Sequence, residues 1–120
     1  MSAVDIKTIF LDIDGCLVKH SGSTLQQIES MPELLPGVRE KLLEWEHAGA
    51  VLILITGRRE SLRCVTEEML LYLGIAYNML IMNLPRGPRV VINDMKPTTT
   101  SPTALAWSPK RNQGLQDCPY

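Results

Sequence analysis

The sequence lacks the features that mark several large classes of protein. Its three cysteines, Cys16, Cys64 and Cys118, are odd in number and form no Cys-x-x-Cys pair, so neither a disulfide framework nor a zinc knuckle is indicated. No apolar run approaches the roughly 18 residues that a membrane span needs, and no basic segment followed by a long apolar stretch opens the chain. These absences predict a soluble, unprocessed protein of the cytoplasm with reduced thiols.

The charge pattern is also without a strong bias. The net charge is −1 with acids and bases interspersed, which does not favour nucleic acid or an anionic membrane as the principal partner. A P-loop is absent, because the chain contains no Gly-x-x-x-x-Gly-Lys. We therefore expect a small-molecule substrate. The 120 residues fit one domain, 1–120, and an apolar content of 45% is enough for a core.

What the sequence does have is three apolar runs that each lead into a residue able to bind phosphate or a divalent cation. They are residues 8–11 before Asp12, residues 51–55 before Thr56 and residues 90–92 before Asn93 and Asp94. The carboxyl ends of parallel strands lie along one edge of a sheet, where open α/β folds bind ligands. The recurrence therefore predicts a small phosphate-handling enzyme.

The order of the expected elements favours an α/β fold. Helices are expected from Pro36–Gly37 to Gly49 and from the turn after Thr56 to Gly74. Strands are expected at residues 7–13, 50–55, 79–82 and 89–93, with an edge strand at 103–107. Strands separated by helices imply βαβ units, and hence a three-layer sandwich with a central parallel sheet.

Two segments are expected to lie outside this core. Residues 15–35 have no helical period, and the polar cluster at residues 20–23 predicts a short hairpin, or flap, over the end of the first strand. Residues 108–120 are expected to form a polar tail. No cap domain fits between the expected elements, yet a phosphoryl-transfer site usually needs cover from water. The flap or a neighbouring subunit would supply it, so we expect a homo-oligomer.

Asp12 and Asp14 are the strongest chemical signal. Two acids two residues apart at a strand end point to the same side, and Gly15 lets the backbone turn so that the carbonyl of Asp14 also faces the site. A nucleophile, a proton donor and a metal ligand would then lie within a few ångströms. The simpler alternative is that Asp-Gly is a common turn pair and the acids only end a strand.

Thr56 and Asp94 have similar double interpretations. The Thr56 hydroxyl and the amides of the following turn, which includes Gly57, can bind phosphate oxygens, or Thr56 can simply cap the next helix. Asp94 can supply the remaining anionic oxygen that a magnesium site prefers, or it can form an Asx turn before Pro97. Neither residue is specific alone.

Together these segments resemble the haloacid dehalogenase superfamily, in its phosphatase branch. Its first signature, a hydrophobic strand followed by Asp-x-Asp-Gly, is matched by residues 10–15. The second, a strand followed by Thr or Ser, is matched by residues 54–58, and the fourth, a strand followed by a small residue and Asp, by residues 92–94. Residues 87–97 look like small capless members linked to sugar phosphates and surface polysaccharide.

The resemblance implies a magnesium-dependent phosphomonoesterase that acts on a small phosphorylated metabolite, such as a sugar phosphate, through an aspartyl-phosphate. Asp12 would attack phosphorus in line, while Asp14 would protonate the leaving oxygen and later activate water. Asp12, the Asp14 carbonyl and Asp94, with Asn93 beside it, would hold Mg²⁺, and Thr56 would bind the phosphoryl oxygens. Dehalogenating relatives do not need the second acid, so Asp14 favours phosphoryl transfer.

The cation of the family's third signature has no obvious match. Lys96 lies near the expected metal site, and Pro97 restricts its backbone to an extended conformation, so we rank Lys96 first and Arg86 second. Arg89 begins a predicted strand whose opposite end holds the site, roughly 13 Å away at about 3.3 Å per residue, and is not expected to reach it. The simpler alternative for Lys96 is a solvated surface side chain.

Two further residues are candidates for substrate contact. Arg58 follows the phosphate-binding Thr56 closely, although it also suits a solvated helix face. His20 lies in the expected flap, where binding residues occur, although an exposed loop His often has no special role. Cys16 is expected to pack rather than to react, because no His lies at a recognisable spacing.

Two other functions remain open. One is a phosphotransferase or pathway-coupled phosphatase acting on a nucleotide-activated sugar. The other is a catalytically weak binding or scaffold module on the same fold, which the irregular third and fourth signatures keep in view.

Overall fold

The computed structural model describes residues 6–120 apart from Ser21, Ser30 and Thr99. Ser21 and Ser30 belong to the expected flap and Thr99 to the threonine-rich loop after Pro97, so the predictions about these three residues lie outside the described part of the chain. In chain order the elements are β1 (Thr8–Asp12), α1 (Thr24–Glu29), α2 (Val38–His47), β2 (Val51–Ile55), the 3-10 helix η1 (Glu60–Leu62), α3 (Arg63–Tyr72) and β3 (Met79–Ile81).

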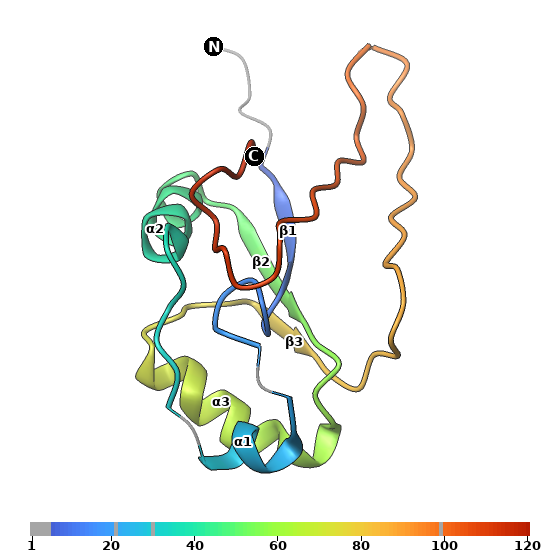
Figure 1. Cartoon of the computed structure of the whole chain (residues 1–120). Coiled ribbons are helices and arrows are strands. Elements are labelled where there is room, and N and C mark those ends of the chain that lie inside the picture. Colours follow the sequence, from blue (N-terminus) through green and yellow to red (C-terminus); the bar gives the residue numbers. More distant parts are fainter. Residues whose placement is uncertain (1–5, 21, 30, 99) are drawn as a thin grey trace.

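The three strands form one parallel sheet in the order β1-β2-β3, which confirms the α/β class (Figure 1). In the pairing of β1 with β2, Asp12 lies opposite Ile55, and in the pairing of β2 with β3, Ile55 lies opposite Ile81. The three strands therefore end level with one another. This register brings Asp12 and the residues that follow Ile55 and Ile81 to the same edge of the sheet, as the sequence predicts.

Helices α2 and α3 lie between successive strands, where they were expected. Pro36 and Gly37 precede α2, and Gly74 follows α3 with a φ of 73°, a left-handed conformation that glycine adopts without steric penalty. No helix in the described part of the chain is long and apolar enough to cross a lipid bilayer. Both predicted helices are confirmed.

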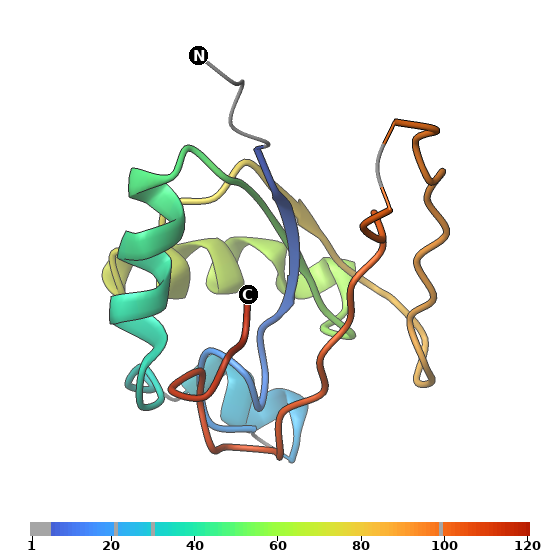
Figure 2. The same ribbon diagram turned by 90° about the horizontal axis from the view of Figure 1, so that it is seen from above.

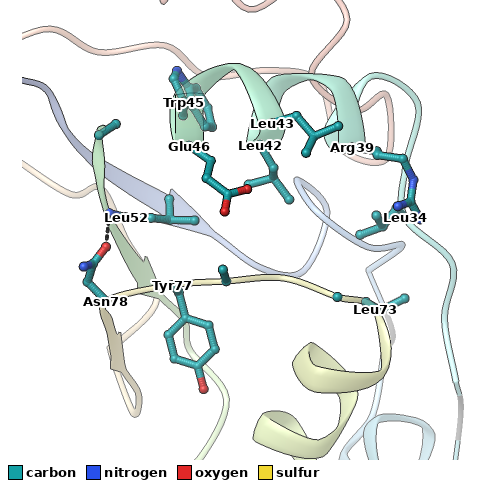
Figure 3. Close-up of a pocket in the computed structure, with 13 residues that line it drawn as sticks. Leu34, Arg39, Leu42, Leu43, Trp45, Glu46, Leu52, Leu73, Tyr77 and Asn78 are labelled. Carbon is teal, nitrogen blue, oxygen red and sulfur yellow. Dashed lines mark hydrogen bonds between the residues drawn. The ribbon is translucent and has the colours of Figure 1, made fainter. Parts of the chain in front are cut away.

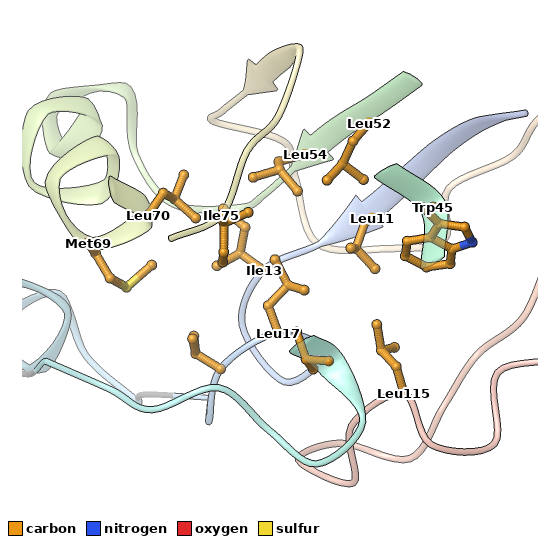
Figure 4. Close-up of a cluster of buried hydrophobic side chains, with 12 residues drawn as sticks. Leu11, Ile13, Leu17, Trp45, Leu52, Leu54, Met69, Leu70, Ile75 and Leu115 are labelled. Carbon is orange, nitrogen blue, oxygen red and sulfur yellow. The ribbon is translucent and has the colours of Figure 1, made fainter. Parts of the chain in front are cut away.

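The hydrophobic core lies on one face of the sheet (Figure 4). Leu11 and Leu54 point into it together with side chains of α2 and α3. On the opposite face Phe10, Met79 and Ile81 remain 50%, 55% and 37% exposed. Both helices thus cover the same face, as right-handed crossovers that advance in one direction across a sheet require. The continuous apolar run at residues 7–13 is typical of a strand buried on both faces, but in the structure the first strand is covered on one face only.

The expected flap at residues 15–35 is not a hairpin. Thr24–Glu29 form α1, which begins with reciprocal side-chain caps: the Gln26 amide donates to Ser23 Oγ at 3.2 Å, and the Gly22 amide donates to Gln26 Oε1 at 2.9 Å. This is a variant of the Ser-x-x-Gln capping box in which the Gln26 side chain accepts from Gly22, the residue before the Ser23 cap. This local helix signal outweighs the turn signal of the polar residues around it.

The predicted strands at residues 89–93 and 103–107 are also absent from the described structure. Residues 82–98 have no strand or helix, and Val90 and Ile92 are 79% and 93% exposed. Thr103 instead bonds the backbone carbonyls of Asn93 and Asp94 at 3.3 and 2.6 Å. An apolar β-branched run becomes a strand only where a neighbouring backbone pairs with it, and here β1 pairs with β2 alone among the described residues.

The expected polar tail at residues 108–120 packs against the body of the protein (Figures 1 and 2). Leu115 is 3% exposed and belongs to the core, and its amide donates to the Pro36 carbonyl at 2.9 Å. The single apolar side chain among polar neighbours gave no periodic signal, so the sequence could not reveal this contact. We refer to residues 110–118 as the C-terminal strap.

We predict that Leu115→Ala lowers the free energy of unfolding by about 2–5 kcal/mol, because it leaves a cavity in a closed core. Urea unfolding followed by circular dichroism measures the change. Leu105→Ala is the matched control, since Leu105 is 48% exposed and its truncation should change stability by no more than about 0.5 kcal/mol. Equal stability of the two variants would show that the strap is not part of the core.

Candidate active site

Asp12 is the last residue of β1 and lies half-buried at the carboxyl edge of the sheet. Its Oδ1 accepts a hydrogen bond from the Ile13 amide at 3.0 Å. Burial raises the pKa of the Asp12 carboxyl above its usual value, and the positive charges of Arg89 and His20 oppose that rise. The negative charge of Asp14, two residues further along the chain, raises this pKa further.

Asp14 is held by a buried arginine. Arg58 Nε donates to Asp14 Oδ2 at 2.9 Å and Arg58 Nη2 donates to Asp14 Oδ1 at 2.8 Å. The side chains are 3% and 12% exposed, so this two-point ion pair lies largely out of water. Arg58 Nη1 also donates to Thr66 Oγ1 of α3 at 3.3 Å. The alternative of a solvated Arg58 is therefore wrong. The guanidinium joins the loop after β1 to the helix that follows β2.

Thr56 contacts the arginine of this pair. Its side chain is buried, and its Oγ1 accepts a hydrogen bond from the Arg58 amide at 3.0 Å, so the hydroxyl stabilises the turn that carries Arg58. Gly57, between them, is exposed. Thr56 therefore does not cap the next helix, whose N-cap residue is Arg59 without a side-chain cap bond; its hydroxyl closes the turn before that helix instead. The hydroxyl proton remains able to donate.

The loop after β1 brings His20 to the same region. The His20 charge acts on Asp12, and the His20 amide donates to Asn112 Oδ1 of the strap at 2.8 Å. Cys16, in the same loop, has a thiol whose pKa is raised to about 11 by burial and by the charges of Asp12 and Asp14. A thiol with that pKa is protonated at neutral pH, which supports packing rather than nucleophilic chemistry for Cys16.

The structure does not bring Asn93 and Asp94 to these acids. Both are exposed, and the Asn93 side chain donates to the Thr103 carbonyl at 3.1 Å within the 83–107 segment. Within residues 6–120, as far as they are described, no group of three His, Cys, Asp or Glu side chains could hold a metal ion. As arranged, the residues do not fit the magnesium site expected from the sequence, since Asp14 is paired with Arg58 and Asp94 lies on another segment.

Arg89 is a cation that the sequence argument set aside. Its charge lowers the pKa of both Asp12 and Cys16, so it lies within electrostatic reach of the candidate site. Its exclusion required a strand at residues 89–93, and the described residues form no strand there. Lys96 and Arg86, the two preferred cations, are exposed on the same segment. No local pattern in the sequence distinguishes Arg89 from them.

A pocket of about 210 Å³ lies between α2 and the segment leading into β3 (Figure 3), away from Asp12. Leu52 and Asn78 line it near the amino ends of β2 and β3, where the Leu52 amide donates to Asn78 Oδ1 at 2.8 Å. Asp12 occupies the opposite edge of the sheet. The pocket is also smaller than the roughly 300–1,000 Å³ usual for ligand sites, so we assign it no role in the chemistry.

Comparison with known proteins adds little to this geometry. No family model matches the chain, and no solved structure matches it. A relative from Methanocaldococcus jannaschii, "Uncharacterized protein MJ0015", is 45% identical over 56 residues, which cover 46% of this chain and 56% of that protein. The chain thus spans little more than half the length of this relative, whose name states no activity. Part of the sequence is therefore similar to an archaeal protein, and the match does not assign the chain to a family.

We predict that Arg58→Ala destabilises the protein by about 3–5 kcal/mol, because it leaves the Asp14 carboxylate unpaired in a buried position. The neighbouring exposed residue offers a control, since Arg59→Ala should change the free energy of unfolding by no more than about 0.5 kcal/mol. Denaturant unfolding at neutral pH separates the two. Similar stabilities would mean that the Arg58–Asp14 pair contributes little to the fold.

Asp12→Asn should make the protein more stable at pH 7. The pKa of Asp12 is raised above its ordinary 3.8 on folding, so the native state loses stability as the pH rises through that value to the folded pKa. The amide removes this loss while it keeps the acceptor for the Ile13 amide. Thermal unfolding should show the gain at pH 7 and its decline as the pH falls toward 4. Asp117→Asn, at an exposed position, serves as the control. An Asp12→Asn variant less stable than wild type at pH 7 would show that the charged Asp12 carboxylate does not destabilise the native state.

Proposed function

We propose that the protein is a phosphomonoesterase of the haloacid dehalogenase type. The observation that carries this proposal is the group formed at the carboxyl edge of the sheet. There Asp12 and Asp14 follow β1, while Thr56 and Arg58 follow β2, with Asp14 fixed by two hydrogen bonds from Arg58. This combination suits a phosphoryl group. The carboxylates can act on phosphorus and on the leaving oxygen, while the cationic and hydroxyl donors position the group and stabilise its negative charge.

In this proposal Asp12 is the nucleophile. One of its carboxylate oxygens attacks phosphorus, the bond from phosphorus to the leaving oxygen breaks, and a proton from Asp14 passes to that oxygen. Water then attacks the aspartyl-phosphate, gives its proton to Asp14 and releases phosphate and the Asp12 carboxylate. Each Asp14 oxygen accepts one bond from Arg58 and keeps a second lone pair, which leaves room for the proton.

Several neutral and cationic groups bind and position the phosphoryl group in this proposal. Arg58 orients Asp14, while Thr56 and Gly57 bind phosphoryl oxygens. Lys96 and Arg86 remain the expected cations on the resemblance, and Arg89 joins them because its charge already acts on Asp12. His20 is a candidate for contact with the leaving group, since it lies in the loop beside Asp12.

The resemblance also implies Mg²⁺, with Asp12, the Asp14 carbonyl, Asp94 and Asn93 around it. The bound ion would neutralise charge on the phosphoryl group. Because the described arrangement keeps Asp94 on a separate segment, no step above depends on the metal. In the family's three-layer core the 89–93 run would form a further strand, and in this proposal that strand pairs with the free edge of β1 and brings Asp94 to Asp12.

The substrate proposed is a small phosphorylated metabolite, a sugar phosphate being the class that the resemblance favours. We place the protein in the cytoplasm as a capless enzyme in a homo-oligomer, where a neighbouring subunit covers the site.

One observation favours a second function, a binding or scaffold module of low activity. Both oxygens of Asp14 are engaged by Arg58, and Asp94 lies apart from them.

Release of phosphate from a panel of sugar phosphates and other metabolite phosphates, with Mg²⁺ present, tests the proposal. We predict turnover of at least one compound and a loss of at least about a thousandfold in Asp12→Asn, whose amide cannot act as the nucleophile. Thermal unfolding of the variant shows that it is folded. Loss of turnover in EDTA, restored by Mg²⁺, supports the metal. Activity on no compound, or turnover in Asp12→Asn within tenfold of wild type, moves the assignment to the binding module.

A further inference from the structure

The loop after β1 is compact but is not closed by its own bonds alone. The Leu17 and Val18 amides donate to the Ile13 carbonyl at 2.9 and 3.2 Å, and the Gly15 amide donates to the Val18 carbonyl at 2.7 Å. Two other backbone groups of the loop, the Gly15 carbonyl and the His20 amide, bond outside it. Both groups bond to one residue, which lies more than 90 positions further along the chain.

That residue is Asn112 of the C-terminal strap. The Asn112 backbone amide donates to the Gly15 carbonyl at 2.9 Å, and the Asn112 side-chain Oδ1 accepts from the His20 backbone amide at 2.8 Å. Asn112 has a φ of 65°, in the left-handed region that Asn adopts more readily than most residues. One side chain and its own backbone therefore bridge the beginning and end of the loop segment that carries Asp14 and His20.

The strap itself is tightly held. Leu115 is buried in the core and donates its amide to Pro36, and a Cβ on Gly114 would lie only 2.0 Å from the Pro36 carbonyl oxygen. The Arg111 stem also packs over the site loop, because its Cγ lies 3.3 Å from the place where a Cβ on Gly15 would be. The strap can thus act as a fixed support for the loop (Figures 1 and 2).

We propose that Asn112 is a positioning residue for the candidate site, and that the strap supports the site loop through it. Asn112 fixes the 15–20 segment against the strap, and the loop in turn presents Asp14 to Arg58 and His20 to Asp12. The catalytic consequence rests on the proposed phosphatase function, whereas the support of the loop does not. Two measurements keep these parts separate.

The variants are chosen so that the backbone of the strap is preserved. Asn112→Gly keeps the left-handed backbone and the bond to Gly15 but removes the acceptor for His20. Asn112→Asp retains an oxygen acceptor in the same place. Gln113→Ala changes an exposed neighbour and serves as the control.

Amide hydrogen exchange followed by NMR tests the support of the loop. In Asn112→Gly the His20 amide should exchange about tenfold faster or more, while the Leu54 amide in the centre of β2 keeps its wild-type rate. Asn112→Asp and Gln113→Ala should retain His20 protection. An unchanged His20 rate in Asn112→Gly overturns the proposal, and so does an equal acceleration of His20 and Leu54, which would indicate general destabilisation.

Turnover of p-nitrophenyl phosphate tests the catalytic consequence. A loop that holds Asp14 loosely should lower kcat by about tenfold or more in Asn112→Gly with KM changed by less than about twofold. An unchanged kcat with accelerated His20 exchange would overturn the positioning role. If the wild-type protein cleaves neither this compound nor any metabolite phosphate, the proposed function fails, and the exchange measurement still decides whether Asn112 supports the loop.

Discussion

Arg58 and Asp14 connect the two parallel strands that define the candidate site. Strand pairing brings the ends of β1 and β2 level, but it does not determine where the side chains beyond those ends point. The two hydrogen bonds from Arg58 do so for Asp14, and Thr66 and the Thr56 hydroxyl hold Arg58 in turn. A buried pair of this kind contributes specificity of arrangement more reliably than net stability, because both charges lose water when they are buried.

The parts of the fold that were predicted correctly are those with local signals. The runs that became β1, β2 and β3 are apolar and end in polar or turn residues, and α2 and α3 have helical spacing with glycine beyond their ends. Helix α1 also had a local signal, the Ser23 and Gln26 capping box, which the turn composition concealed. The run at residues 89–93 has strand composition, but whether it pairs depends on a partner elsewhere in the chain.

The same distinction applies to the candidate site. Asp12, Asp14 and Thr56 share an edge because a parallel register follows from the order of strands and helices. The buried partner of Asp14 was not predictable from spacing, since a pair of arginines at the start of a helix also suits solvent. The role of Asn112 was even harder to predict from the sequence, because its partner His20 is 92 residues away.

The docking of the strap has a consequence for the order in which the protein is made. Chains fold as they leave the ribosome, and amino-terminal segments are available first. The sheet and both long helices involve residues 8–81, which all leave the ribosome before the strap does. The loop after β1 receives its support only after Asn112 has emerged. A nascent chain stalled before that point would contain every residue of the sheet and helices but lack the strap that supports the site loop.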